Sequence, residues 1–366
     1  MARENLTALI SLAATDAARW DLNGAIPLEV LRTLGAEGAL CAEVPSAYGG
    51  AGLSGLENGE LTSHTGALCS SLRSVMTSQG MAAWTIQRFG DEAQRRTQLA
   101  RLTGGGLAAV AFSEPQAGSD LSAMSTRIRP EGTEVIVDGS KTWVTAAAYA
   151  DVIVVFGTYG GDAAAVLVPA SAPGVRVEPV ADPLGCRAAG HCGVSLEAVR
   201  LPADSVLSGS RAPAALITTM ALTYGRLSVA WGSVGIVRAC LAASASHAKN
   251  REQFGKPLAQ HQLVARHLAE LVVAEQTATR VCEHASRCWD SRSPGLVTAA
   301  VLAKYVAAGN AVRGASSAVQ VLASAGARDG HVVARAYRDA KLMEIIEGSN
   351  EICQLMLAGH AIEGAA

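Results

Sequence analysis

The spacing of apolar residues divides the chain into a helical part, a β-rich part and a second helical part. Up to about residue 105, apolar side chains recur at helical spacing, most clearly over 84–102. From Ala108 to about Leu207, short β-prone runs alternate with Gly, Asp and Pro, which predicts a compact β module. Helical spacing then returns over 215–249, 262–278, 294–325 and 337–360.

The order of these parts predicts the architecture. Several long helical segments with short connections are typical of a bundle. A doubly wound α/β fold is excluded, because its strands and helices alternate along the chain. We expect an N-terminal helical domain over 1–107, a middle β domain over 108–210 and a C-terminal helical bundle over 211–366. The protein is therefore predicted to be mainly α with a central β domain.

Composition and charge exclude several classes of protein. The chain has 366 residues, with 30 Lys and Arg against 32 Asp and Glu, so its net charge of −2 offers no basic surface for nucleic acid or an anionic membrane. Hydrophobic residues make up 49% and charged residues 17%, which excludes intrinsic disorder. Apolar runs are interrupted before the roughly 18 residues that a membrane helix requires, for example at Arg226.

The cysteines and the N-terminal segment indicate a reducing, cytoplasmic setting. Eight cysteines show no spacing typical of a disulfide framework, and Glu4 and Asp16 bracket an apolar run too short for a secretory signal. Two cysteine–histidine groups lack the paired spacing of structural zinc, so we expect no metal. These groups are Cys186, His191 and Cys192, and Cys282, His284 and Cys288.

The stretch 50–55 matches the dinucleotide-binding pattern G-x-G-x-x-G in its letters only. That pattern requires a preceding strand and an acidic residue about 20 positions further on. Pro45 and Tyr48 precede the stretch, and Ser70 and Ser71 stand where the acid belongs. We interpret the stretch as a loop. Neither a G-x-S-x-G nucleophile elbow nor a P-loop occurs, which removes the best support for a hydrolase or a nucleoside-triphosphatase.

Four separated segments together resemble the acyl-CoA dehydrogenase flavoprotein family. They are 111–120 (AFSEPQAGSD), 139–145 (GSKTWVT), 251–258 (REQFGKPL), and 338–341 (RDAK) leading into 346–352 (IEGSNEI). They stand in the family's order, and the likeness extends over essentially the whole chain. The resemblance implies the family's fold, with a middle β-barrel and a C-terminal four-helix bundle, and an oxidoreductase that uses FAD.

The resemblance also implies where FAD binds. A flavin requires a flat apolar wall, hydrogen-bond donors at its polar edge and amides for its pyrophosphate. Taken alone, Trp143 would be a core aromatic, Thr145 a β-former and Arg251 an exposed helix-end cation. In the family, positions near Thr145 face flavin N5, and positions near Arg251 hold FAD of a neighbouring subunit, which implies a homo-oligomer, either dimer or tetramer. The cofactor-binding residues implied are Phe112, Ser113, Ser119, Trp143, Thr145, Arg251, Phe254, Gln262, Gln320, Ala323, Ser324, Ser349 and Glu351.

Glu347 is the expected catalytic base. Removing a proton α to a thioester carbonyl requires a carboxylate held beside that carbon. In the family, the Glu of the E-G-[ST] motif takes this proton while the β-hydrogen leaves as hydride to flavin N5. Glu344, one turn earlier on the same helical face, and Glu351 are the alternatives. The substrate-binding residues implied by the resemblance are Ser119, Arg226 and Gly348.

Departures from the family pattern point to the carrier of the acyl group. Thr223 stands where the family commonly has an acid three residues before Arg226, and 353–359 (CQLMLAG) lacks two arginines. Ala323 and Ser324 replace two common glycines, so the close approach of backbone to pyrophosphate is less secure. Each missing charge-assisted hydrogen bond weakens the binding of coenzyme A by about 1.5–3 kcal/mol. We therefore expect a small acyl group on acyl carrier protein, which presents only a phosphopantetheine arm.

The leading interpretation is an FAD-dependent acyl-CoA or acyl-carrier-protein dehydrogenase. The Ala- and Gly-rich chain is similar to the branch that makes methoxymalonyl-type polyketide extender units, whose acyl group is a small hydroxylated three-carbon unit. Electrons would leave to an electron-transfer flavoprotein or another acceptor. Three alternatives stay open: an ordinary short-chain acyl-CoA dehydrogenase, a flavin oxidase or monooxygenase on the same fold, and a flavoprotein without turnover.

Overall fold

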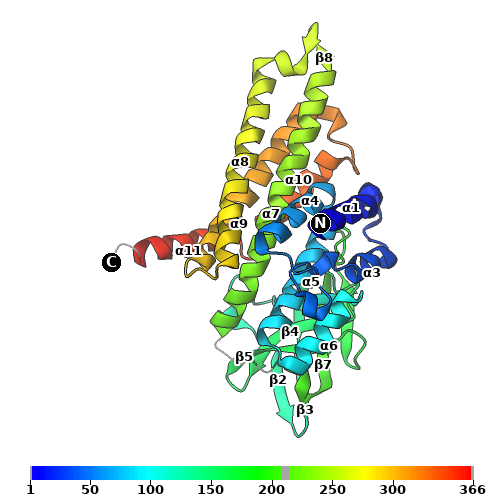
Figure 1. Ribbon diagram of the computed structural model, residues 1–366, viewed down its shortest axis with the longest axis vertical. Coiled ribbons are helices and arrows are strands. Elements are labelled where there is room, and N and C mark those ends of the chain that lie inside the picture. The colour runs from blue at the N-terminus through cyan, green and yellow to red at the C-terminus, as the bar shows by residue number, and fades with distance from the viewer. Residues whose placement is uncertain (1, 208, 210–213, 364–366) are drawn as a thin grey trace.

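The computed structural model describes residues 2–207, 209 and 214–363 (Figure 1). The chain begins with a group of helices that contact both the β domain and the long C-terminal helices. These helices are α1 (Ala2–Ala13), α2 (Ala17–Asn23), α3 (Leu28–Ala36), α4 (Gly55–Leu68), α5 (Ser70–Phe89) and α6 (Glu92–Thr103). The loop predicted over 50–55 leads into α4, whose N-cap is Ser54.

The prediction of one continuous helix over 84–102 is wrong. The backbone leaves the helical conformation at Gly90, so α5 ends at Phe89. A new helix then starts, because the Asp91 side chain accepts a hydrogen bond from Gln94 N and the Gln94 side chain accepts one from Asp91 N. This reciprocal capping satisfies two backbone donors that would otherwise be left free at a helix start.

The middle of the chain forms one curled seven-stranded sheet, as the β-prone runs predict. Its strands are β1 (Ala108–Ala111), β2 (Arg127–Glu131), β3 (Glu134–Val144), β4 (Val152–Tyr159), β5 (Asp162–Pro169), β6 (Val175–Pro179) and β7 (Cys192–Pro202). The strand order is β1-β4-β2-β3-β7-β6, with β5 paired to β4. Strands β1 and β4 are parallel, whereas β3 pairs with β7 antiparallel. Their apolar side chains fill a core that includes Ile128, Val137, Ile153, Val166 and Leu196.

The C-terminal part is a set of long helices that runs along the long axis of the molecule (Figure 1). It contains α7 (Ala214–Asn250), the small hairpin β8 (Glu252–Gln253) and β9 (Lys256–Pro257), α8 (Gln262–Asp290), α9 (Leu296–Leu322), α10 (Val332–Met343) and α11 (Asn350–Glu363). The expected three-part architecture is confirmed. The expected boundary at 210/211 lies outside the described residues.

Helix α7 is the core helix of this bundle. Over Thr218–Asn250 it is long and apolar enough to cross a membrane, but 72% of its most apolar window is buried inside the protein. Burial against α9, α4 and α8 explains its apolar composition. Arg226, which interrupts the apolar run of this helix, is buried as well. Its side chain belongs to the site described below.

The segment 337–360 is also interrupted, contrary to the continuous helical pattern expected there. Helix α10 ends at Met343 and α11 begins at Asn350. Between them, Glu347 and Gly348 both have positive φ, at 57° and 90°, which no α-helix allows. Helix α11 then runs outward from the long helices (Figure 1).

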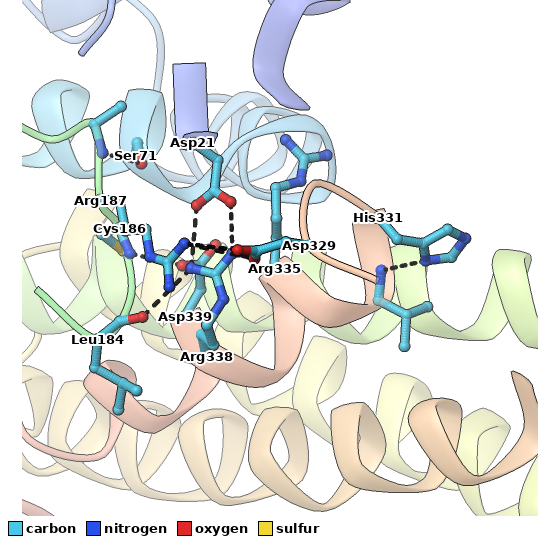
Figure 2. A network of polar contacts seen from close by, with 12 residues as sticks. Asp21, Ser71, Leu184, Cys186, Arg187, Asp329, His331, Arg335, Arg338 and Asp339 are labelled. Atoms are coloured by element: carbon cyan, nitrogen blue, oxygen red, sulfur yellow. Dashed lines mark hydrogen bonds and ion pairs between the residues drawn. The ribbon is translucent and has the colours of Figure 1, made fainter. Parts of the chain in front are cut away.

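A polar network anchors α10 to the rest of the fold (Figure 2). Arg338 of α10 donates to both carboxylate oxygens of Asp21 on α2 and to the carbonyl of Leu184 in the loop before β7. The buried carboxylate of Asp339 accepts from Cys186 N in the same loop. The RDAK motif therefore connects three elements. These contacts fix the direction of α10 and, with it, the position of the turn that follows this helix.

Candidate active site

Glu347 lies in the turn between α10 and α11 and points back into the protein. Its carboxyl lies against Gly225 of α7, where the carboxyl and the Met81 side chain of α5 would leave no room for a side chain on residue 225. Within the described part of the chain, the buried Oε2 has no hydrogen-bond partner. An unpartnered buried carboxyl oxygen is costly unless a ligand uses it, so this atom is the centre of the candidate site.

Cations surround this carboxyl. Burial raises the pKa of Glu347 to about 7, against the opposing effect of Arg226, Lys304 and Arg73. Arg226 donates from Nε to the carbonyl of Glu347 at 3.1 Å, and Gly348 lies next to it in the turn. A carboxyl with a pKa near neutrality is suited to take up a proton at physiological pH.

The two acidic alternatives occupy different surroundings. The expectation that Glu344 shares a helical face with Glu347 is wrong, because α10 ends before Glu347. The Glu344 carboxylate pairs with Lys341 at 2.8 Å and accepts from the Asn350 amide. Glu351 lies exposed in the first turn of α11. Neither carboxyl combines the burial and the free oxygen of Glu347.

A second group of predicted residues lies where the strands of the β domain end. The amide of Thr142 donates to the carbonyl of Ser113 at 2.9 Å, which joins the ends of β1 and β3. A register shift in the pairing of β3 with β7 precedes Val144, and Trp143 has φ 54°. This irregular strand end leaves the Trp143 side chain half-exposed, as a bulge beside a functional site does.

His191 is a site residue that sequence reasoning missed. Its Nδ1 lies 3.2 Å from the hydroxyl of Thr145, and its ring makes an edge contact with Trp143. Burial lowers the pKa of His191 to about 4, so the ring is neutral. Its buried Nε2 has no partner among the described residues. The sequence offered His191 only as part of a metal pattern, which hid this placement.

The structure also shows what holds the loop after β1. Phe112 does not present its ring to solvent: the ring stacks on Phe156 in the core, and its carbonyl accepts from Lys141 Nζ at 3.0 Å. Lys141 also forms a fully buried ion pair with Glu114 at 2.8 Å. Glu114 further accepts from the amides of Ser125 and Thr126. Nothing in a linear pattern marks this pair, because its members are far apart in sequence.

A third group lies at the other end of the molecule. Arg251 lines a surface hollow of about 490 Å³ together with His247, Leu322 and His331. Phe254, at the tip of the β8–β9 hairpin, is 95% exposed. The remaining predicted residues of this group are also exposed: Gln262, Gln320, Ala323 and Ser324. Ala323 adopts φ 50°, a conformation that explains why glycine suits this position.

Two of these groups fit the two parts of FAD but lie apart in one chain: the group around Trp143 and the group around Arg251. A half-exposed Trp143 and a neutral His191 with a free nitrogen suit a flavin ring. The hollow with Arg251, and the exposed Phe254 ring, suit a nucleotide and its phosphates. The β8–β9 hairpin lies at the opposite end of the long axis from the β domain (Figure 1).

The other predicted residues are placed as follows. Ser119 lies exposed on the loop between β1 and β2. Ser349 directly precedes α11, and its Oγ accepts from the amide of Ile352 at 3.4 Å. Arg226 and Gly348 are brought to Glu347, whereas Ser119 is not among the residues that contact that carboxyl.

Comparison with known families matches nearly the whole chain. The description "Acyl-CoA dehydrogenase, N-terminal domain" matches residues 1–106, the "middle domain" matches 109–199, and the "C-terminal domain" matches 215–362. The mitochondrial short-chain specific acyl-CoA dehydrogenase of Homo sapiens is 31% identical over 353 residues, which are 94% of this chain and 85% of that protein.

Solved structures agree with this match. A structure described as FkbI for biosynthesis of the methoxymalonyl extender unit of the FK520 polyketide immunosuppressant is 59% identical, with a TM-score of 0.93 and 99% of each chain covered. Butyryl-CoA dehydrogenase from Megasphaera elsdenii is 27% identical, with a TM-score of 0.93, over 99% of this chain and 98% of that one.

Proposed function

Because this chain belongs to the acyl-CoA dehydrogenase family, we propose that Glu347 takes the α-proton from a small acyl group carried by acyl carrier protein. The chain is an FAD-dependent dehydrogenase of acyl thioesters. FAD, when bound, supplies the acceptor for the hydride. The observation that carries the proposal is the buried, unpartnered Oε2 of Glu347.

The residues around Glu347 determine how it works. With a pKa of about 7, the carboxyl is largely ionised just above neutral pH and can accept a proton at Oε2. Gly225 has no side chain, and the Glu347 carboxyl occupies the space where one would lie, which lets the carboxyl pack closely against α7. The positive charges of Arg226 and Arg73 stabilise the carboxylate before the transfer and the negative charge that develops on the substrate during it.

The wall between α5 and α7 favours a short, polar acyl group. Arg73 donates from Nη1 to the hydroxyl of Thr77, which lies 2.6 Å from the hydroxyl of Ser228. All three side chains are buried, and Arg73 lies beside Gly232 and Met343. The two hydroxyls pair with each other, but the buried Nε of Arg73 has no hydrogen-bond partner among the described residues. A hydroxylated acyl group of a few carbons would offer that donor an oxygen, whereas an alkyl chain would not.

Three observations support a carrier protein in place of coenzyme A. The Thr223 hydroxyl is buried and donates to the carbonyl of Thr219, so it offers no charge to a nucleotide. The segment 353–359 on α11 contains no arginine. The FkbI relative, at 59% identity, serves biosynthesis of a methoxymalonyl extender unit. We propose that the electrons then pass to an electron-transfer flavoprotein.

Anaerobic titration of the flavin absorbance tests the carrier. We expect a short hydroxylated acyl group on carrier protein to bleach the flavin band at least about tenfold faster than the same group on coenzyme A, because cationic partners for the nucleotide are missing. Butyryl-coenzyme A serves as the matched control for ordinary short-chain activity. Equal rates of bleaching with both carriers would contradict the carrier-protein proposal and indicate an ordinary acyl-coenzyme A dehydrogenase.

The subunit arrangement is a separate prediction. Since the two FAD-binding groups lie at different ends of one chain, we propose that each FAD contacts two subunits in a homo-oligomer. Light scattering should give a dimer or a tetramer. Phe254→Ser should reduce FAD content without changing the fold, because the exposed ring has no core to support. A monomer that retains stoichiometric FAD would contradict this arrangement.

A further inference from the structure

Lys304 is a charged side chain in the middle of an alanine-rich helix. It belongs to α9, whose neighbouring Ala300, Ala303, Ala307 and Ala308 are all buried, and Lys304 itself is 0% exposed. Burying an ammonium group costs several kcal/mol unless every donor is satisfied. The proposed mechanism gives this lysine no direct contact with the reacting atoms, so its presence needs another explanation.

All three hydrogen bonds of the Lys304 ammonium end in the segment that carries Glu347. Nζ donates to the carbonyl of Glu344 at 3.1 Å, to the carbonyl of Gly348 at 2.8 Å and to Oδ1 of Asn350 at 3.2 Å. These acceptors bracket Glu347 on both sides. They are uncharged oxygens, so the contacts hold a backbone shape and do not form an ion pair.

That backbone shape is unfavourable by itself. Glu347 has φ 57°, and the left-handed conformation is unfavourable for an L-residue with a side chain because its Cβ comes too close to the following carbonyl oxygen. Gly348 follows with φ 90°. Strained conformations of this kind persist only where their surroundings over-determine them. Arg226 supplies a further contact, through its hydrogen bond to the Glu347 carbonyl.

We propose that Lys304 is a positioning residue for the catalytic base: it clamps the turn 344–350 in the strained shape that aims the Glu347 carboxyl between α5 and α7. The proposal rests on the proposed function of Glu347. Two helices thus hold the turn through two buried cations, Lys304 from α9 and Arg226 from α7.

The charge of Lys304 has a second effect at the same place. Burial raises the pKa of Glu347, while Arg226 of α7, Lys304 of α9 and Arg73 of α5 lower it. The other titratable groups near Lys304 are Cys353, Glu344 and Glu351. Removal of the ammonium should therefore loosen the turn and shift the pH dependence of the reaction upward, and a merely structural lysine would not produce the second change.

The test compares the FAD-loaded wild type with Lys304→Met, which keeps the length of the side chain and removes its donors. Lys341→Met is the matched control, since Lys341 is exposed and its ammonium pairs with the Glu344 side chain. Hydrogen exchange should be faster in peptides covering 344–353 of Lys304→Met. The backbone amide of Asn350 donates to the Glu344 carbonyl that Lys304 holds, so loosening the turn exposes this amide to exchange. Exchange in that segment equal to wild type would overturn the proposal.

The kinetic arm measures flavin reduction between pH 6 and 8. Lys304→Met should lower the limiting rate by about 10- to 100-fold, as a small misplacement of a catalytic group does. Its midpoint pH should also rise by about half a unit or more. Lys304→Gln, which retains a donor, should recover part of the rate and serves if Lys304→Met fails to fold. A lower rate with an unchanged midpoint and unchanged exchange would refute the clamp.

The exchange measurement needs no substrate, so it separates the two hypotheses. If Lys304→Met loosens the turn while Glu347→Gln retains full activity, the clamp stands and the assignment of the base fails. If Glu347→Gln is inactive and the turn exchanges normally in Lys304→Met, the base stands and the clamp fails.

Discussion

Glu347→Gln should lower the rate of substrate-dependent flavin reduction by about 10²- to 10⁴-fold, the usual contribution of a general base. The substitution keeps the size of the side chain and its fit against Gly225, but an amide cannot take up the α-proton. Stopped-flow absorbance at saturating thioester measures this rate directly. FAD content and thioester binding should be unchanged within about threefold, because the variant removes proton transfer and no binding contact.

The pH dependence of the wild type belongs to the same prediction. A base must be ionised to act, and the pKa of Glu347 is raised by burial to about 7. The rate should therefore fall about tenfold per unit as the pH drops below 7, and level off above it. Glu344→Gln is the matched comparison. A large loss of rate in Glu344→Gln, with a small loss in Glu347→Gln, would assign the role of the base to Glu344.

Lys141→Met should destabilise the protein by about 3–5 kcal/mol, because it leaves the Glu114 carboxylate buried without its cation. Both side chains are inaccessible, at 0% and 1% exposure, so solvent cannot replace the missing partner. Urea unfolding followed by circular dichroism measures the loss. The loop of Ser113 should loosen as well, since Lys141 also holds the Phe112 carbonyl, and FAD should dissociate more readily.

The paired variant identifies the cause. Lys141→Met combined with Glu114→Gln should recover most of the stability, because no uncompensated charge stays buried. A double variant as unstable as the single one would assign the loss to packing. Burial raises the pKa of Glu114, but the hydrogen bonds from Lys141, Thr126 and Ser125, together with the charge of Lys141, outweigh burial and lower that pKa to about 2. The stability that Glu114 contributes is therefore complete above about pH 4.5 and lost as the pH falls toward 2.

Much of the site could be predicted because its residues stand in short local motifs. The segment 346–352 identifies Glu347, and 251–258 identifies Arg251 and Phe254. Helical periodicity failed at two places, Gly90 and the turn before Asn350. In both, apolar residues continue at helical spacing across the break, so the pattern alone shows no interruption. At the first break the backbone becomes extended at Gly90 and a capping box starts a new helix, and contacts from α7 and α9 hold the second break.

The sequence by itself determined the order of the helical and β parts and the family resemblance, and it predicted which acidic residue acts as the base. Periodicity and motifs carry this information because they depend on neighbours a few positions apart. Only the tertiary structure decided which charges meet: Lys141 with Glu114, His191 with Thr145, and Lys304 with the turn of Glu347. A buried charge is stable only where segments that are distant in the sequence bring its partners. A local sequence pattern does not show which distant segments meet.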